Sequence, residues 1–426
     1  AVFEDGDALT IGGDLTAKAT HVADSTTIAK GDTKGTDAAV GISFALTVAE
    51  DDVTAQLLRD VTSTGGGVSV TAEGASASTT ESQASATGAP VDNSNQNVND
   101  QTGAQAGQAQ SQSAARTSSG ATPSSASTGQ GQANASNNGS SLTVAAAISL
   151  NIADMDVIAS IDNGAVVNTT GAVEVTARGN MDAQAEADGS ATTIPASGTN
   201  STNIGAAVAL NWGSADIDAI LGDADVTAGG LTVQALMFER GDDDTHTFGA
   251  KATSGASGGS TGVAGSFALN LPSVSTSALV SNDAVVAITG AGDVVVKSVS
   301  KTESSVVAGA ATDAKKAQST GSSSSGGTSG TSGTGSSSTK SGNTIGVGVS
   351  IGVNVSDMLT EASLGGNAAL TGAQNLTIEA DGTHAMTTSV EGGAEAAGGS
   401  AVTPVIGISV AQNAVRADLP SGTELT

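Results

Sequence analysis

One segment of alternating apolar residues recurs five times along the chain, and this repetition constrains the fold more than any other feature. The copies read AVGISFALT (39–47), TVAAAISLN (143–151), NIGAAVALN (203–211), GVAGSFALN (262–270) and IGVGVSIGVN (345–354). Each copy ends in a marker residue, which is Thr in the first copy and Asn in the other copies. Such self-similarity predicts one structural unit that is stacked along an axis.

The spacing of the markers gives the length of the unit. Consecutive markers lie 104, 60, 59 and 84 residues apart, and Asn413, in a sixth partial copy, follows after 59 more. The markers are Thr47, Asn151, Asn211, Asn270 and Asn354. The base period is therefore 59–60 residues, and the two long intervals contain insertions rich in Ser, Gly, Ala and Gln. Both insertions leave from the junction that precedes the apolar segment, so we expect them on one face of the array.

The period divides the chain into modules and insertions. In order they are a C-terminal half-module (1–36), module 1 (37–83), an insertion (84–141), modules 2, 3 and 4 (142–202, 203–261 and 262–314), a second insertion (315–343), module 5 (344–400) and an N-terminal half-module (401–426). Alternation within a module predicts several short strands. Coils of about twenty residues would then give three coils per module.

The composition favours a thin core that is repeated along the chain. Aromatic residues make up 1% of the chain, and there are 57 glycines, so burial must be shared among Val, Ile, Leu and Ala. These observations predict an all-β fold, a parallel β-solenoid (β-helix) rod with modules of about 60 residues and room for projecting β-hairpins. Stacked antiparallel β-sheet repeats are the alternative.

Each apolar segment has a large row and a small row. A row of mostly large apolar residues alternates with a row of Ala, Ser or Gly in every copy. We expect the Leu or Val before each marker, such as Leu210, to point into the core. The small row then predicts a second layer that packs close against the strand.

The charge excludes several classes of partner. Lys and Arg total 14 against 42 Asp and Glu, a formal charge of −28, so the chain repels nucleic acid phosphates and anionic lipid. No run of about 18 apolar residues predicts membrane insertion. The absence of cysteine excludes disulfides and thiolate-ligated metals. We therefore expect no nucleic acid partner and no membrane insertion.

Catalytic signals are weak. The three histidines are isolated from any pattern typical of a catalytic triad, and we expect them to be solvated. One Trp and no Tyr are available to stack on a sugar, which disfavours a β-helical carbohydrate-active enzyme. The sequence thus predicts that the protein is not an enzyme and requires no cofactor.

Acidic residues follow the markers and form a candidate Ca²⁺ site. Asp154 and Asp156 follow the second marker, and Asp216 and Asp218 follow the third. Ca²⁺ binds six to eight oxygen ligands, which stacked turns can bring together. Solvated acidic turns are the alternative, because the fourth copy has serines at these positions. Arg240, Gly241 and Asp242 form a tripeptide that some host receptors bind, and a solvated acidic run is again the alternative.

The two ends of the chain are complementary half-modules. Ile406, Ile408 and Val410 alternate before Asn413 and are followed by Leu419, while Leu9 and Leu15 belong to the opposite half. Joining the ends places Leu15 28 residues past Asn413, against 20 to 24 between marker and equivalent residue inside the chain. We expect these residues to mediate head-to-tail assembly into a homopolymer. The alternative is one giant tandem-repeat polypeptide, because the chain opens at Ala1 without a Met or signal-like segment.

Two stretches resemble the tandem repeats of large bacterial surface adhesins. They are TVAAAISLNIADMDVIASIDNGAVVNTTGAVEVTAR (143–178) and NIGAAVALNWGSADIDAILGDADVTAGGLTVQA (203–235), which are similar to filamentous-haemagglutinin-like and leukotoxin-like filamentous adhesins. The resemblance implies secretion to the cell surface, a β-helical shaft and an adhesive or structural role, with no catalytic residues. An extracellular fibre subunit or adhesin shaft is the leading hypothesis. A Ca²⁺- or glycan-binding module that recognises host or matrix glycans is the alternative.

Overall fold

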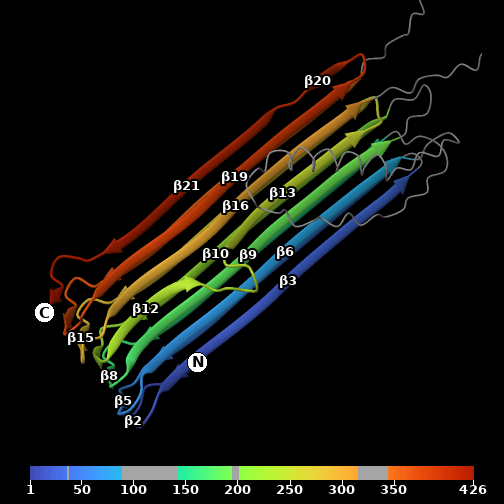
Figure 1. Cartoon of the computed structure of the whole chain (residues 1–426). Helices are drawn as coiled ribbons and strands as arrows, with labels where there is room; N and C mark the ends of the chain where they lie inside the picture. The colour runs from blue at the N-terminus through green and yellow to red at the C-terminus, as the bar shows by residue number, and fades with distance from the viewer. Residues whose placement is uncertain (36–37, 89–141, 194–200, 315–343) are drawn as a thin grey trace, which may run out of the picture.

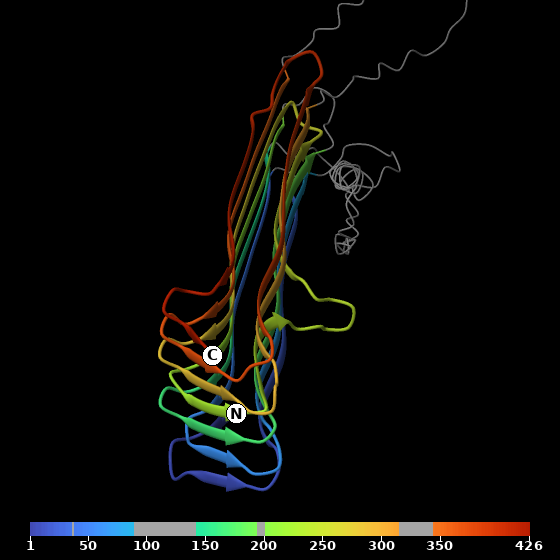
Figure 2. The same ribbon diagram turned by 60° about the vertical axis from the view of Figure 1, so that its left-hand side comes forward.

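The computed structural model describes residues 1–35, 38–88, 142–193, 201–314 and 344–426 as a parallel β-solenoid. Its named strands pair in parallel within three sheets, here called A, B and C, which are drawn in Figures 1 and 2. The predicted all-β parallel solenoid is therefore confirmed, and the antiparallel alternative is wrong. None of the described residues belongs to a helix that could cross a membrane.

Sheets A and C consist of long strands, and sheet B consists of short ones. Sheet A contains β1 (Val2–Phe3), β4 (Ala38–Leu57), β7 (Leu142–Ile161), β10 (Thr202–Leu221), β14 (Thr261–Val280), β17 (Ile345–Leu364), β20 (Ser400–Val402) and β21 (Val405–Asp418). Sheet B contains β2 (Leu9–Ile11), β5 (Val61–Ser63), β8 (Val166–Thr169), β11 (Asp225–Ala228), β15 (Val285–Ile288), β18 (Ala369–Thr371) and β22 (Glu424–Leu425). Sheet C contains β3 (Leu15–Gly35), β6 (Val68–Gly88), β9 (Ala172–Thr193), β12 (Gly230–Met237), β13 (His246–Ser257), β16 (Val294–Ala314) and β19 (Leu376–Ala396).

One module forms one coil. The chain runs along sheet A, turns through sheet B and returns along sheet C before it enters sheet A again (Figure 2). The prediction of three coils of about twenty residues per module is therefore wrong. The physical reason is that the alternation continues unbroken through the marker, so the segments expected to be separate strands join into strands of 20 and 21 residues such as β4 and β6.

The core has a narrow part and a wide part. Before the markers, sheet A faces the second halves of the sheet C strands, and an alanine cluster fills the space between them. After the markers, sheet A, sheet B and the first halves of the sheet C strands enclose larger residues, including Met155, Val157 and Ile161. Figure 2 shows the two long sheets close together at one end and separated by sheet B at the other.

The narrow part reverses the expected direction of the apolar segment. The small row points inward, as Ala207 and Ala209 show, whereas Leu210 faces outward and is only partly buried. The prediction that Leu210 points into the core is wrong, while the prediction of a layer packed close against the small row is confirmed. The reason is space: a Cβ added to Gly348 would lie 2.6 Å from the carbonyl oxygen of Gly393 on sheet C.

The markers are structurally equivalent, as predicted. Thr47 pairs with Asn151, which pairs with Asn211, and the register continues through Asn270 to Asn354. The sixth copy differs, because Asn354 pairs with Ser409 and the proposed marker Asn413 pairs with Met358. The assignment of Asn413 as a marker is therefore wrong by four residues.

Both insertions leave from the junction between sheets C and A. Residues 89–141 and 315–343 lie outside the described residues, whereas 84–88 belong to β6. The strand ends that flank the two gaps lie at the same end of the sheets as the short connection between β13 and β14 (Figure 1). In that connection Gly258 has a φ of 82°, a conformation that favours glycine.

Candidate functional site

The four aspartates of the Ca²⁺ hypothesis lie on the outer face of sheet A, after the markers. Asp156 pairs with Asp216, and Asp218 lies two residues further along β10. Burial and then the neighbouring carboxylate of Asp154 raise the pKa of both Asp156 and Asp216. Burial, followed by the charge of Asp216, raises the pKa of Asp218 to about 6. These carboxylates repel one another across the strands.

This acidic row does not have the geometry of a metal site. Within the described residues, no group of three or more His, Cys, Asp or Glu side chains is arranged to hold a metal ion. The side chains rise side by side from a flat sheet, whose backbone carbonyls pair with neighbouring strands. Asp154, Asp156, Asp216 and Asp218 therefore share a face without converging on one point, and the Ca²⁺ hypothesis gains no support.

Two of the three histidines differ from the solvated side chains expected from the sequence, and His21 agrees with that expectation. His246 is fully buried, its Nδ1 accepts a hydrogen bond from the Met181 backbone N–H at 2.9 Å, and its ring stacks on Phe248. Burial lowers the pKa of His246 to about 3, so the imidazole is neutral. His384 is half-buried and its pKa is lowered by burial as well. His21 is exposed and contacts the Asp51 carboxylate at 2.7 Å. Among the described residues, no histidine ring is hydrogen-bonded to both a hydroxyl and a carboxylate, as the histidine of a triad is.

A loop over residues 238–245 interrupts sheet C between β12 and β13. It projects from the outer face of that sheet (Figure 2). The Arg240 guanidinium donates two hydrogen bonds to Asp24, from Nη1 at 2.9 Å and from Nη2 at 2.7 Å. Because Arg240 pairs with Asp24 within the chain, the Arg-Gly-Asp tripeptide does not present a free arginine.

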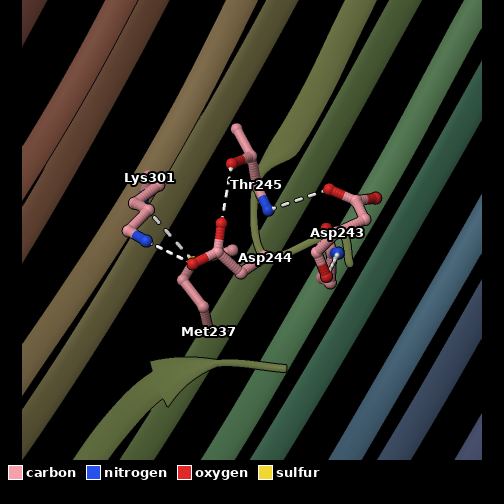
Figure 3. A network of polar contacts seen from close by, with 6 residues as sticks. Met237, Asp243, Asp244, Thr245 and Lys301 are labelled. Atoms are coloured by element: carbon pink, nitrogen blue, oxygen red, sulfur yellow. Dashed lines mark hydrogen bonds and ion pairs between the residues drawn. The ribbon is translucent and has the colours of Figure 1, made fainter. Parts of the chain in front are cut away.

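A second set of contacts anchors the other side of this loop. Lys301 on β16 forms an ion pair with Asp244, and the Asp243 carboxylate accepts a hydrogen bond from the Thr245 backbone N–H at 3.1 Å (Figure 3). The Lys301 backbone N–H lies 3.4 Å from the Met237 sulfur. The loop is therefore fixed to strands on both sides through Arg240 and Asp244, whereas Glu239 and Asp242 are exposed.

The residues expected to mediate assembly fall into two places. Leu15 is buried in the first coil, Leu9 packs against the same core, and Leu419 is exposed in the last coil. Ile406 and Ile408 lie on β21 and pair with Ile351 and Val353 on the outer face of sheet A. Val410 pairs with Val355 on the same face. The C-terminal residues thus continue a row that runs across the whole sheet.

That row is the largest feature that the sequence interpretation missed. From the apolar segments to the first position past each marker, the outward residues are apolar in coil after coil; Ile42 is 66% exposed, Phe44 56% and Trp212 59%. The outer face of sheet C is polar by contrast, with ion pairs such as Lys251–Glu186 at 2.5 Å and Lys297–Glu379 at 3.1 Å. The sequence does contain a signal for the outward orientation of this row. In the alternating pattern of the strand, Leu150 lies on the same face as Asp154 and Asp156, and Met155 and Val157 lie on the other face.

Comparison of the chain with protein-family models, with curated proteins and with solved structures gives no significant match. The candidate surfaces must therefore be interpreted from their own geometry.

Proposed function

We propose that the chain is a structural element of a bacterial surface fibre or adhesin shaft, in which solenoids continue end to end. The observation that supports this proposal is the open edges at the two ends. At the N-terminal end, β3 pairs only with β6, and β4 has a second partner only at Gln56 and Leu57, among the described strands. At the C-terminal end, β21 pairs only with β17 and β19 only with β16, again among the described strands.

The two ends are offset in a way that allows them to fit. The first coil contributes a long strand to sheet C and only β1 to sheet A, whereas the last coil contributes β21 to sheet A and no long strand to sheet C. A second solenoid can therefore place its β3 against β19 and its β4 against β21. Both long sheets then continue across the joint, and the unpaired backbone groups of these edges gain partners.

The short strands limit how the joint forms. Leu15 lies 32 residues past Ser409 when the ends are joined (426 − 409 + 15), whereas Val68 lies 21 residues past Thr47 (68 − 47). The surplus corresponds to β2 and β22, which both belong to sheet B. One of these short strands must move aside when β3 meets β19. β1 or the end of β21 must also move, because β1 pairs with β4 at Gln56, in the register that Asp418 has on β17.

The same edges can be covered by further coils of one long polypeptide, and the proposal includes both forms of the shaft. Its location outside a bacterial cell rests on the resemblance of the modules to filamentous adhesins. Mass spectrometry of native material distinguishes the forms: subunits of 40.5 kDa support end-to-end assembly, and a larger polypeptide supports covalent continuation.

Electron microscopy of the chain tests end-to-end assembly directly. We expect filaments, and we expect deletion of residues 405–426 to abolish them, because this variant lacks the strand that would lie against β4 of the next copy. Deletion of residues 90–138 is the matched control, since it changes neither end. Single particles at all concentrations, or filaments that form equally well without 405–426, would contradict end-to-end assembly.

A further inference from the structure

The outer face of sheet A carries an apolar surface that the chain does not cover with any described residue. We call it the apolar panel and define it as the outward residues of segments 40–48, 144–152, 204–212, 263–271, 347–355 and 406–410. The parallel register aligns them strand by strand, so that Ile148, Val208 and Phe267 are direct neighbours. These outward positions include no charged side chain.

We propose that the apolar panel is an interface between two copies of this chain, packed face to face with their strands antiparallel. This pairing is independent of end-to-end assembly, because it uses the side of the solenoid rather than its ends.

The area of the panel supports a stable interface. Five strands of nine residues and one of five, about 4.8 Å apart and rising about 3.3 Å per residue, give roughly 800 Å². A standard protein interface buries about 800 Å² on each partner. The largest apolar patch on a typical monomer covers only about 300–600 Å². The panel therefore has the size expected of an interface rather than of an ordinary surface.

Charge selects the antiparallel orientation. Beyond the panel, the outer face of the same strands carries Glu50, Asp52, Asp154, Asp156 and Asp216. Parallel strands would set these carboxylates against those of the second copy. With antiparallel strands, the two panels lie opposite one another. The acidic half of each strand then extends past the point where the partner's strand begins, so it faces no carboxylate of the partner. A two-fold axis along the solenoid axis produces this arrangement, so paired solenoids can continue into one fibre.

The composition and charge of the chain disfavour other occupants. Between them, residues 89–141 and 315–343 contain no Ile, Leu, Met, Phe or Trp, so they offer little apolar surface to cover the panel. A lipid layer would bring the acidic region of the same flat face against the headgroups, and the chain carries a formal charge of −28. A second copy avoids both problems.

The chain contains no cysteine, so an introduced cysteine is its only thiol and a thiol-specific reagent can cross-link only there. Val208 lies in the middle of the panel, so in the antiparallel pair Val208→Cys faces its own equivalent across a gap of about 10 Å between the sheets. A short bismaleimide should therefore join two chains. Ser214→Cys faces the same side but lies six residues further along β10, which separates the two equivalents by about 40 Å. Gln184→Cys, on the outer face of sheet C, is the second control. Neither control should cross-link.

Sedimentation of the full chain supplies the second measurement. We expect a species with the mass of two chains below the concentration at which filaments form. Leu210→Asp should lower the association constant at least about a hundredfold, because two carboxylates enter the apolar interface. Its far-UV circular dichroism should remain that of the unsubstituted chain, since Leu210 is outside the core. Gln184→Asp should leave association unchanged.

Three results would overturn the proposal. They are a chain that stays single at about 50 µM, cross-linking at Ser214→Cys or Gln184→Cys as strong as at Val208→Cys, and a single chain that floats with phosphatidylcholine vesicles. The last result would assign the panel to lipid. Filaments without cross-linking at Val208→Cys would refute lateral pairing alone, whereas cross-linking without filaments would refute end-to-end assembly alone.

Discussion

Four buried asparagines lie side by side across the middle of sheet A, and their side-chain amides are hydrogen-bonded to one another in a ladder inside the core. Asn151 donates from its amide nitrogen to Asn211 at 2.9 Å, Asn211 donates to Asn270 at 2.7 Å, and Asn270 donates to Asn354 at 3.3 Å. The ladder sits where the narrow part of the core meets the wide part. Each asparagine therefore holds the register of its strand, because a shift would leave a buried amide without partners.

The substitution Asn211→Ala tests the ladder. It removes one donor and one acceptor and leaves the facing groups of Asn151 and Asn270 buried without that partner, so the free energy of unfolding should fall by about 2–4 kcal/mol. Ser214→Ala, on the outer face of the same strand, should change it by less than about 0.5 kcal/mol. Chemical denaturation measures both variants, and equal effects would contradict a structural role for the ladder.

Protonation of buried carboxyls gives the stability a defined pH dependence. Burial raises the pKa of Asp182, Asp188 and Asp218 to about 6, so between pH 6 and 4 these groups bind protons more readily in the folded state and stability is gained as the pH falls. His246 acts oppositely below pH 6.5, because only the unfolded state binds its proton. Burial lowers the pKa of His384 as well, and it raises the pKa of Asp156 and Asp216. Five carboxyls therefore outweigh two imidazoles at pH 5.

We therefore expect the midpoint of thermal unfolding to rise from pH 7 to pH 5. Asp218→Asn should raise the midpoint at pH 7 and reduce the gain on acidification, since the buried charge is removed. Asp242→Asn, which removes a charge from the exposed loop, should leave the pH dependence unchanged. A midpoint that falls steadily from pH 7 to pH 5 in the unsubstituted chain would contradict this assignment.

The long strands of sheet A alternate inward and outward residues along their whole length, but the types of residue on each face differ between the first and second half of the strand. In β10 the inward residues from Gly205 to Ala209 are all small, whereas those after Asn211 include the large Ile217 and Leu221. The outward residues are apolar as far as Trp212 and become acidic at Asp216 and Asp218. One strand thus lines a thin core and then a thick core, and it presents an apolar and then an acidic outer face.

Replacing either of two neighbouring alanines on β10 by a larger residue should affect the free energy of unfolding very differently. Ala207 lies in the alanine cluster between the sheets, so Ala207→Leu should destabilise the fold by about 3 kcal/mol or more through overpacking. Ala206 faces outward, and Ala206→Leu should leave the free energy of unfolding within about 0.5 kcal/mol of the original value. Denaturant unfolding of both variants tests the orientation, and a greater loss at Ala206 would reverse it.

The sequence predicted the repeat, the sheet type and the equivalence of the first five markers, because each depends on spacing alone. The outward direction of the large residues in the apolar segment was not predicted. The segment was treated as a strand that ends at its marker, and large residues of such a strand usually point into the core. Following one phase from Ala147 through Asn151 to Val157 assigns the inward face correctly. The contacts of Arg240 with Asp24 could not be predicted, because they join residues 216 positions apart.

At the scale of the whole molecule, each module adds one layer to a blade made of two long sheets and one short one (Figure 1). Parallel strands stack at about 4.8 Å, and a strand of twenty residues spans roughly 66 Å. The shaft is therefore wide across its strands and grows slowly along its axis. Insertions at the junction between sheets C and A leave this stacking unchanged.

Deletion of residues 90–138 tests that independence. In other coils the same junction is closed by a few residues, as between Ser257 and Thr261, so the remaining residues can connect Gly88 to Leu142. We expect the β-sheet signal in the far-UV circular dichroism and the midpoint of thermal unfolding to be retained, because loop length has a modest entropic effect. Loss of the β-sheet signal would show that the insertion completes the core.

The axial rise per module in a cryo-electron microscopy reconstruction of the filament tests most directly whether one module forms one coil. One coil per module predicts a rise of about 4.8 Å for each module of 59–60 residues, with strands perpendicular to the fibre axis and continuous across the joint between copies. A rise near 14 Å per module, or a joint at which the strand edges of β19 and β21 are left unpaired, would contradict it.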